Sequence, residues 1–173
     1  MATPLTPSAF EPRGKRPPPY RAPRVRLWAV RNAALLAGIY SGFETTLKRI
    51  APLLAWIGFD RLERPVAAVE RTVKGALFDC RMCGDCVLSS TGLSCPMNCP
   101  KALRNGPCSG VRANGNCEVY PEMPCVWVKA YEGSLAMPGG ARIAEIQPPI
   151  DHRLKGGSAW LKRMREFAQA EQP

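Results

Sequence analysis

Apolar residues recur every three or four positions between residues 24 and 78. The first run with this spacing is Leu36, Tyr40, Phe43, Leu47, Ile50, Leu54 and Ile57. Side chains spaced in this way lie along one face of an α-helix, so we expect a helix here. Pro52 should end or kink that helix, or else stand in the first turn of a second one, because proline lacks the N–H that a helix interior requires.

The same spacing continues after a short break. The second run is Leu62, Val66, Val69, Val73 and Leu77, and Pro65 stands near the expected start of its helix. We expect most of these apolar positions to pack in a core. A small domain offers little surface to pack against, so part of the stripe is expected to cover a partner.

The rest of the chain divides around these helices into three further regions. Residues 1–23 form a proline-rich, basic arm, which we expect to be extended or disordered. Residues 79–127 hold every cysteine and are rich in turn-forming residues. Residues 128–173 predict a long loop over 128–157, followed by a short helix. The 24–78 helical segment thus precedes a cysteine-rich domain and a C-terminal loop and helix.

The predicted last helix runs from Ser158 to about Gln169. Ser158 is a suitable N-cap, because its hydroxyl can accept a hydrogen bond from the first turn. The apolar residues of this helix are Trp160, Leu161, Met164 and Phe167.

The charge of the chain is strongly positive, with 24 Lys and Arg residues against 14 Asp and Glu residues. The basic residues near the start are Arg13, Lys15, Arg16, Arg21, Arg24, Arg26 and Arg31. Such an arm suits an acidic protein face, a phosphate-bearing cofactor or nucleic acid, or it is a solvated tail. No reading helix accompanies the basic residues, which argues against nucleic-acid binding.

The first twenty residues lack the apolar stretch of a secretory signal. The longest apolar stretches, 33–40 and 53–59, fall far short of the ~20 residues that a membrane span needs. We therefore expect a cytoplasmic protein with no membrane segment. Disulfides are rare in a reducing compartment, so the cysteines indicate metal or redox chemistry.

All eight cysteines fall within 46 residues. They are Cys80, Cys83, Cys86, Cys95, Cys99, Cys108, Cys117 and Cys125. The run Cys80-x2-Cys83-x2-Cys86 places three thiolates on one tight loop, with Gly84 allowing the backbone to turn. Three thiolates from such a loop and a distant fourth are a common way to hold a [4Fe–4S] cluster.

Zinc is the main alternative to iron–sulfur, because four thiolates also bind zinc. The overlapping spacing is less typical of zinc sites, and a second clean CxxC pair is missing. Eight thiolates suit two clusters, two zinc ions or one of each, and disulfides are a third reading. We expect Cys80, Cys83 and Cys86 to belong together, whereas spacing does not assign the others.

The sequence lacks the residues that several other kinds of site require. The only histidine is His152, outside the cysteine region, so a Rieske centre with its two histidines is excluded. The sequence has neither a G-x-G-x-x-G motif nor a P-loop. Lys101 and Arg104 would place positive charge near a cluster, or else form a solvated loop face. Trp127 would shield a cluster from water, or else pack in the core.

Residues 79–127 resemble the cysteine-rich C-terminal domain, or separate small subunit, of bacterial methylenetetrahydrofolate reductases. The motifs that carry the resemblance are CRMCGDC from Cys80, TGLSCPMNCPK from Thr91, LRNGPC from Leu103, NCEV from Asn116 and PCVW from Pro124. The resemblance implies a partner with a flavin-bearing TIM barrel, which interconverts methylene- and methyl-tetrahydrofolate. It also implies that FMN or FAD and the folate lie on that partner, because a TIM barrel takes ~250 residues.

These expectations combine into one hypothesis. We expect a small, α-rich, irregular, metal-bound fold, with N-terminal helices and a turn-rich iron–sulfur cysteine domain. The eight cysteines would hold one or two [4Fe–4S] clusters and relay electrons to or from the partner flavin. The chain would then be a non-catalytic subunit of an oxidoreductase complex. The alternative is a structural zinc-binding subunit that stabilises the same reductase.

Overall fold

The computed structural model describes residues 24–170, so the predicted arm over 1–23 lies outside the described residues. The helices are α1 (Arg24–Arg31), α2 (Ala33–Ile57), α3 (Phe59–Phe78), α4 (Val126–Ala136) and α5 (Ala159–Ala170). Shorter 3-10 turns are η2 (Pro96–Asn98), η3 (Gly140–Ala144) and η4 (His152–Leu154). Extended pairing within residues 24–170 is limited to two isolated bridges, Val111 with Cys117 and Asn116 with Pro124. The prediction of an α-rich, irregular fold is confirmed.

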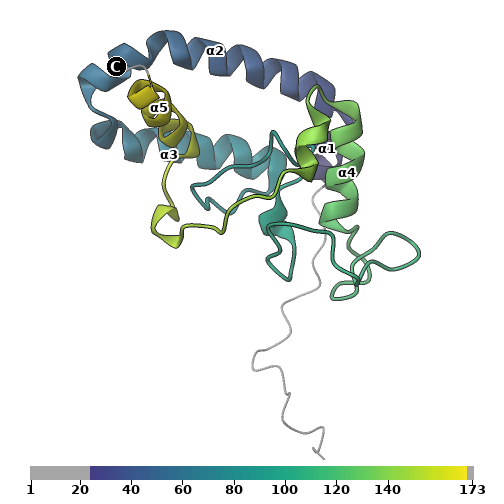
Figure 1. Cartoon of the computed structure of the whole chain (residues 1–173). Helices are drawn as coiled ribbons and strands as arrows, with labels where there is room; N and C mark the ends of the chain where they lie inside the picture. Colours follow the sequence, from purple (N-terminus) through teal and green to yellow (C-terminus); the bar gives the residue numbers. More distant parts are fainter. Residues whose placement is uncertain (1–23, 171–173) are drawn as a thin grey trace, which may run out of the picture.

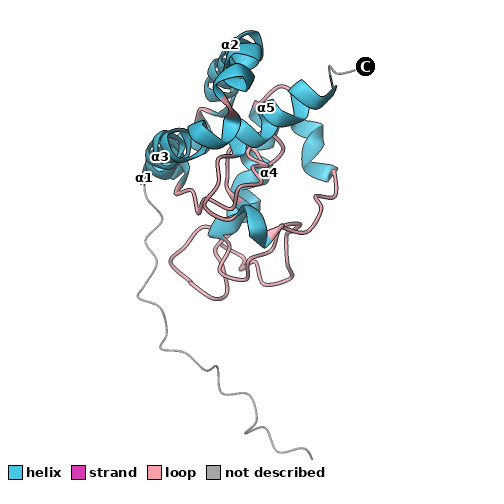
Figure 2. Ribbon diagram, turned by 90° about the vertical axis from the view of Figure 1, so that its left-hand side faces the viewer, coloured by secondary structure: helices cyan, strands magenta, loops and turns pink. Residues whose placement is uncertain are grey.

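Helices α2 and α3 form a long hairpin, and α5 lies against both of them (Figure 1). Gly58 makes the turn between them with a φ of 96°, a conformation that glycine adopts without steric cost. Its N–H donates to the carbonyl of Leu54, 3.1 Å away, and so closes the end of α2. Much of the loop structure lies below α2 and α3 and surrounds α4 (Figure 2).

The predicted stripe on α2 is only partly buried. Ala33 and Ala51 are the buried residues of α2, and the larger stripe members stay half-buried or exposed. Pro52 does not end the helix, which continues to Ile57, and Pro65 likewise lies inside α3. Both prolines face solvent, where water can satisfy the carbonyl that a proline leaves without a partner.

The loop predicted over 128–157 is wrong in its first part, because α4 occupies residues 126–136. Small residues explain both the helix and the error. Ala130 is fully buried, and a Cβ on Gly133 would overlap the carbonyl oxygen of Gly92. Helix α4 therefore packs closely on the cysteine loop through side chains that carry no strong apolar pattern.

The C-terminal helix is confirmed, with bounds within one residue of those predicted. The N–H of Leu161 donates to the Ser158 hydroxyl oxygen at 3.2 Å, so Ser158 caps the helix as expected. Leu161 and Met164 are buried against the hairpin. A separate core, around Ala29, Phe78 and Leu93, joins α1 and α3 to the cysteine loop. No helix in residues 24–170 has both the length and the apolar character needed to cross a bilayer.

Replacing a helical glycine with alanine usually stabilises a protein. Because α4 approaches the cysteine loop so closely, we expect the opposite effect at Gly133. Gly133→Ala should destabilise the protein by about 1–3 kcal/mol, because the added methyl overlaps Gly92 and the packing must shift. Gly42→Ala is the matched control in α2, where a Cβ meets nothing within 4 Å. It should stabilise by about 0.5–1 kcal/mol through helix propensity. Urea unfolding measures both, and equal effects would contradict the packing.

Candidate functional site

Four cysteines line one cavity at the end of α3. Cys80, Cys83 and Cys86 come from the loop that follows α3, and Cys95 comes from the residue before η2. The other residues that border the cavity belong to α3, the cysteine loop and the turn before α5, and include Glu70, Lys74, Asp85, Met97, Arg104 and Gly157. The expectation that the first three cysteines belong together agrees with this arrangement, and the structure adds Cys95 as a fourth.

The end of α3 places Cys80 at the cavity. Asp79 adopts a left-handed conformation with φ 52°, and its N–H donates to the carbonyl of Gly75. The N–H of Cys80 reaches back to the carbonyl of Lys74 at 3.3 Å. These bonds, made around a left-handed residue, end α3 and turn the chain sharply into the cysteine loop.

Asn98 joins the first three cysteines to the fourth. Its side-chain amide donates to the carbonyl of Phe78 at 2.9 Å, and its side-chain oxygen accepts from Arg81 at 3.2 Å. Asn98 is buried and ends the η2 turn that begins just after Cys95. It therefore fixes the distance between the end of α3 and Cys95.

The turn before α5 covers the cysteine loop. The N–H of Gly156 donates to the carbonyl of Met82 at 2.8 Å. Gly84 has a φ of 76°, and a Cβ on it would overlap the backbone of Leu154. The glycine in the middle of the cysteine run is therefore required both for its conformation and for this close contact.

Burial and neighbouring negative charge raise the pKa of two of the cavity thiols, Cys80 and Cys95. Burial raises the pKa of Cys95 to about 12, a backbone N–H at Met97 lowers it in part, and the charges of Cys86, Cys80 and Cys83 raise it further. Burial also raises the pKa of Cys80, against a lowering by the N–H of Met82. Several thiolates can coexist here only if positive charge enters the cavity.

A buried ion pair on α3 borders the same cavity. The ammonium of Lys74 donates to Glu70 at 2.6 Å, and both side chains are almost completely buried. Burial by itself would lower the pKa of Lys74, but the charge of Cys86 and the carboxylate of Glu70 outweigh it and raise the pKa above its ordinary value. Lys74 is therefore a fixed positive charge beside the thiols.

A second set of charges lies on the opposite part of the cysteine loop. The guanidinium of Arg104 is buried, pairs with the carboxylate of Asp85 and donates to the carbonyl of Pro148 at 2.8 Å. Lys162 of α5 donates to the other oxygen of Asp85 at 2.7 Å. The predicted location of Arg104 near the cysteines agrees with this geometry. Lys101 instead contacts Glu118 and the sulfur of Cys108, which lies 3.7 Å from its ammonium.

The remaining cysteines lie in the loops between η2 and α4. Cys117 is buried in a small apolar cluster with Met123 and Val126, and Cys99 packs against that cluster. Cys125 is buried at the start of α4, where its N–H donates to the carbonyl of Gly115 at 3.0 Å. Cys108 lies on the intervening loop beside Lys101. The structure thus brings Cys99 and Cys117 together, apart from the four cysteines of the cavity.

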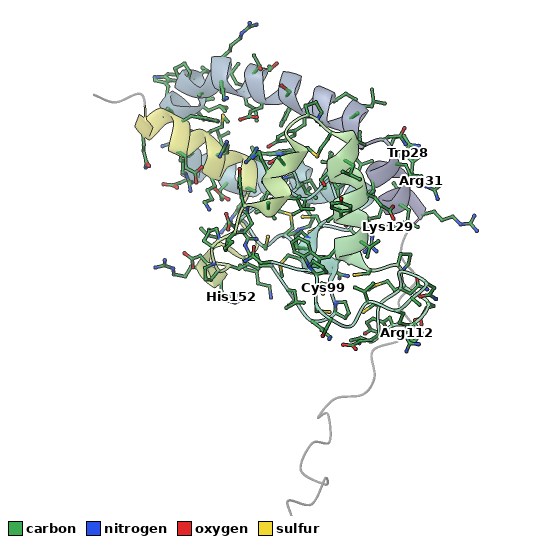
Figure 3. The ribbon with its side chains drawn as sticks, turned by 45° about the vertical axis from the view of Figure 1, so that its right-hand side comes forward. Trp28, Arg31, Cys99, Arg112, Lys129 and His152 are labelled. Carbon is green, nitrogen blue, oxygen red and sulfur yellow. The ribbon has the colours of Figure 1, made fainter. Side chains whose placement is uncertain are left out.

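Two other sequence candidates have clear structural locations. Trp127 is buried, packs with Cys125 and Ala130, and donates from its ring N–H to the carbonyl of Leu103 at 3.2 Å. It is therefore a core residue beside the second group of cysteines. His152 lies on η4 at the edge of the molecule, away from Cys99 in Figure 3, and is exposed.

The donor set of the cavity suits a metal cluster. No three His, Cys, Asp or Glu side chains of residues 24–170 converge closely enough to hold a single metal ion. A cubane instead binds its four thiolates at four different iron atoms, so the sulfurs need to surround a space rather than meet at a point. Four cysteines line one cavity here, with the buried Lys74 and Arg104 beside them, so the residues match the donors of a cubane in number and type.

The fold and site define a small helical protein with a thiol-lined cavity on a turn-rich loop. Residues 59–153, more than half of the chain, match the family described as Methylene-tetrahydrofolate reductase C terminal. The chain therefore belongs to the methylene-tetrahydrofolate reductase C-terminal family, as the cysteine motifs indicated. No curated protein and no solved structure matches the chain.

The pKa of Cys95 predicts selective alkylation in reduced, metal-free protein. At pH 8 roughly one Cys95 thiol in ten thousand is ionised, whereas Cys86 is exposed to reagent. Iodoacetamide should therefore label Cys86 first, and Cys95 should react faster only as the pH rises toward its pKa. Peptide mass spectrometry measures the order, and urea-unfolded protein is the control in which both react alike. Equal labelling in the folded protein would contradict the burial of Cys95.

Proposed function

We propose that this chain is the iron–sulfur subunit of a flavin-dependent methylenetetrahydrofolate reductase, and that it relays electrons to or from the flavin of its partner. The observation that carries the proposal is the single cavity lined by Cys80, Cys83, Cys86 and Cys95. Membership of the reductase C-terminal family supports the link to folate chemistry. When bound, a [4Fe–4S] cluster would supply one-electron transfer at this cavity.

The residues of the chain would perform three tasks around such a cluster. The four thiols would hold it, with their ionisation favoured by the positive charge of the irons. Asn98 would keep Cys95 at a fixed distance from the other three. Phe78, Leu88 and Met97, which pack around Cys95, would limit the access of water and so help to set the potential.

A second cluster on the remaining cysteines is part of the proposal. The packing of Cys99 against the apolar cluster that holds Cys117 supports a shared site, and Cys108 and Cys125 would complete its four thiolates. Zinc in either site is the competing reading, because the donor set also suits zinc. Zinc has no redox chemistry, so it would give a structural subunit rather than an electron relay.

The substrate-binding parts of the reaction are assigned to the partner. Residues 24–170 form no TIM barrel, and the chain has no dinucleotide-binding motif. We propose that the flavin, as FMN or FAD, and the folate are bound by the partner reductase. This chain would contribute the route by which electrons reach or leave the flavin.

An exposed apolar surface supports the presence of a partner. We define the α2 outer stripe as Leu35, Ile39, Ile50, Leu53 and Trp56, all of which are exposed. Trp56 has 84% of its surface accessible. Such a contiguous apolar face on a small protein is typical of an interaction surface, and the reductase subunit is the partner that we propose for it.

The cluster assignment predicts the effect of removing one cavity thiol. Cys86→Ala should reduce the iron content by about four atoms per chain, because a cubane needs all of its ligands. The variant should also lose reductase activity with the physiological reductant and keep activity with an artificial flavin reductant. Iron, sulfide and zinc analysis of anaerobically purified protein provides the measurement.

Ser89→Ala, in the same loop, is the control and should leave iron and activity unchanged. Zinc at full occupancy in the unmodified protein would refute the electron relay and leave the structural alternative. If the Cys86 variant loses both activities together, the cysteines serve assembly rather than electron transfer.

The α2 outer stripe predicts a specific loss of association. Leu53→Glu should weaken binding to the reductase subunit about tenfold or more, because it places a charge within an apolar contact. Ala55→Glu introduces the same charge on α2 about 200° away around the helix and should have little effect. Calorimetric titration with the purified reductase measures both. Equal binding by the two variants would exclude this face as the interface.

A further inference from the structure

A buried pair of oppositely charged side chains, Glu70 and Lys74, lies beside the thiol cavity. Glu70 and Lys74 are one turn apart on α3, have only 1% and 4% of their surfaces accessible, and both border the cavity. Their ionic groups are 2.6 Å apart. Burying a charged pair is costly, and apolar residues of similar size often serve stability equally well or better. The location of the pair therefore calls for a reason other than stability.

Part of that reason is structural and belongs to Glu70. Its second oxygen accepts from the Ser158 hydroxyl at 2.6 Å and from the N–H of Trp160 at 3.2 Å. Glu70 thereby fixes the start of α5 to α3. These bonds explain the carboxylate, whereas they do not require an ammonium at position 74.

Lys74 faces the thiols as well as Glu70. Its ammonium lies 5.1 Å from the centre of the Trp160 ring, and Lys74 lines the same cavity as Cys86. The charge of Cys86 contributes to raising the pKa of Lys74, and Lys74 in turn lowers that of Cys80. Because the ammonium is buried, water and salt screen its field at the cavity only weakly.

We propose that Lys74 raises the reduction potential of the cluster held by Cys80, Cys83, Cys86 and Cys95, an inference that rests on the proposed function. A cubane with four thiolates carries a net charge of about −2 when oxidised and −3 when reduced. Its reduction takes up one electron, from dithionite in a titration or from the redox partner in the complex, and forms or breaks no bond. A fixed positive charge nearby stabilises the added negative charge, and Lys74 supplies it from α3.

Glu70 should act in the opposite direction. Its carboxylate also borders the cavity, so it disfavours the reduced form and offsets part of the Lys74 field. Neutralising each partner in turn should therefore move the potential in opposite directions. A general loosening of the fold, which lets water into the cavity, would move both variants in the same direction.

The experiment is a potentiometric titration of the full chain, purified anaerobically, with the cluster followed by visible absorbance and electron paramagnetic resonance. For Lys74→Met we expect the equilibrium constant for reduction to fall at least tenfold, which is a shift of about 59 mV to more negative potential. Glu70→Gln should shift it to more positive potential, and Lys74→Arg should stay near the unmodified value. Lys155→Met removes an exposed charge and should cause no shift.

The outcomes separate this inference from the proposed function. A preparation without iron and sulfide overturns both. A loaded cluster whose potential is unchanged in Lys74→Met, or moves the same way in both variants, overturns only the role of Lys74. If Lys74→Met fails to load, Glu70→Gln decides, because a positive shift supports the field from α3 and any other result refutes it.

Discussion

Four sulfur atoms share one small cavity, and their negative charges can coexist there only if positive charge balances them. Burial and mutual repulsion raise the pKa of Cys95 to about 12. The protein itself supplies part of this positive charge, because Lys74 and Arg104 are buried and both line the cavity. Each is held by a carboxylate that also links α5 to the rest of the fold. The electrostatics of the site and the attachment of the C-terminal helix are therefore one arrangement.

The η2 turn divides the cysteines between two locations. Cys95 precedes this turn and lines the cavity, whereas Cys99 follows it and packs against the apolar cluster that holds Cys117. Asn98 at the end of the turn bonds back to α3, so the division is tied to the helix that carries Lys74. Two Cys-Pro pairs that look alike in the sequence thus serve different parts of the fold.

Much of the helical structure could be predicted because its signals are local. The apolar spacing over 24–78 and the Ser158 cap each depend on a few neighbouring residues, and both were correct. Helix α4 was missed because its packing relies on Ala130 and Gly133, whose small side chains carry no strong pattern and whose value lies in a distant contact with Gly92. Pro52 was expected to end or kink the helix. It does not end it, because a proline at an exposed helical position destabilises the helix less than one in a core.

The cysteine composition of the candidate site could be read from the sequence, whereas its geometry could be predicted only in part. The spacing of Cys80, Cys83 and Cys86 indicated one group, whereas the choice of Cys95 as the fourth depends on the η2 turn and Asn98. Lys74 and Glu70 could not be recognised, because a Lys–Glu pair one turn apart usually marks a solvated helix face. Only the docking of α5, which is almost ninety residues later in the chain, buries them.

That docking has a consequence for how the protein is made. Gly157 and Ala159 form part of the cavity wall, so the wall is incomplete until the ribosome has released these residues. During synthesis the cysteine loop emerges first and stays open on that side. The cavity therefore lacks this part of its wall while the chain is still growing, and the residues at the start of α5 complete it afterwards.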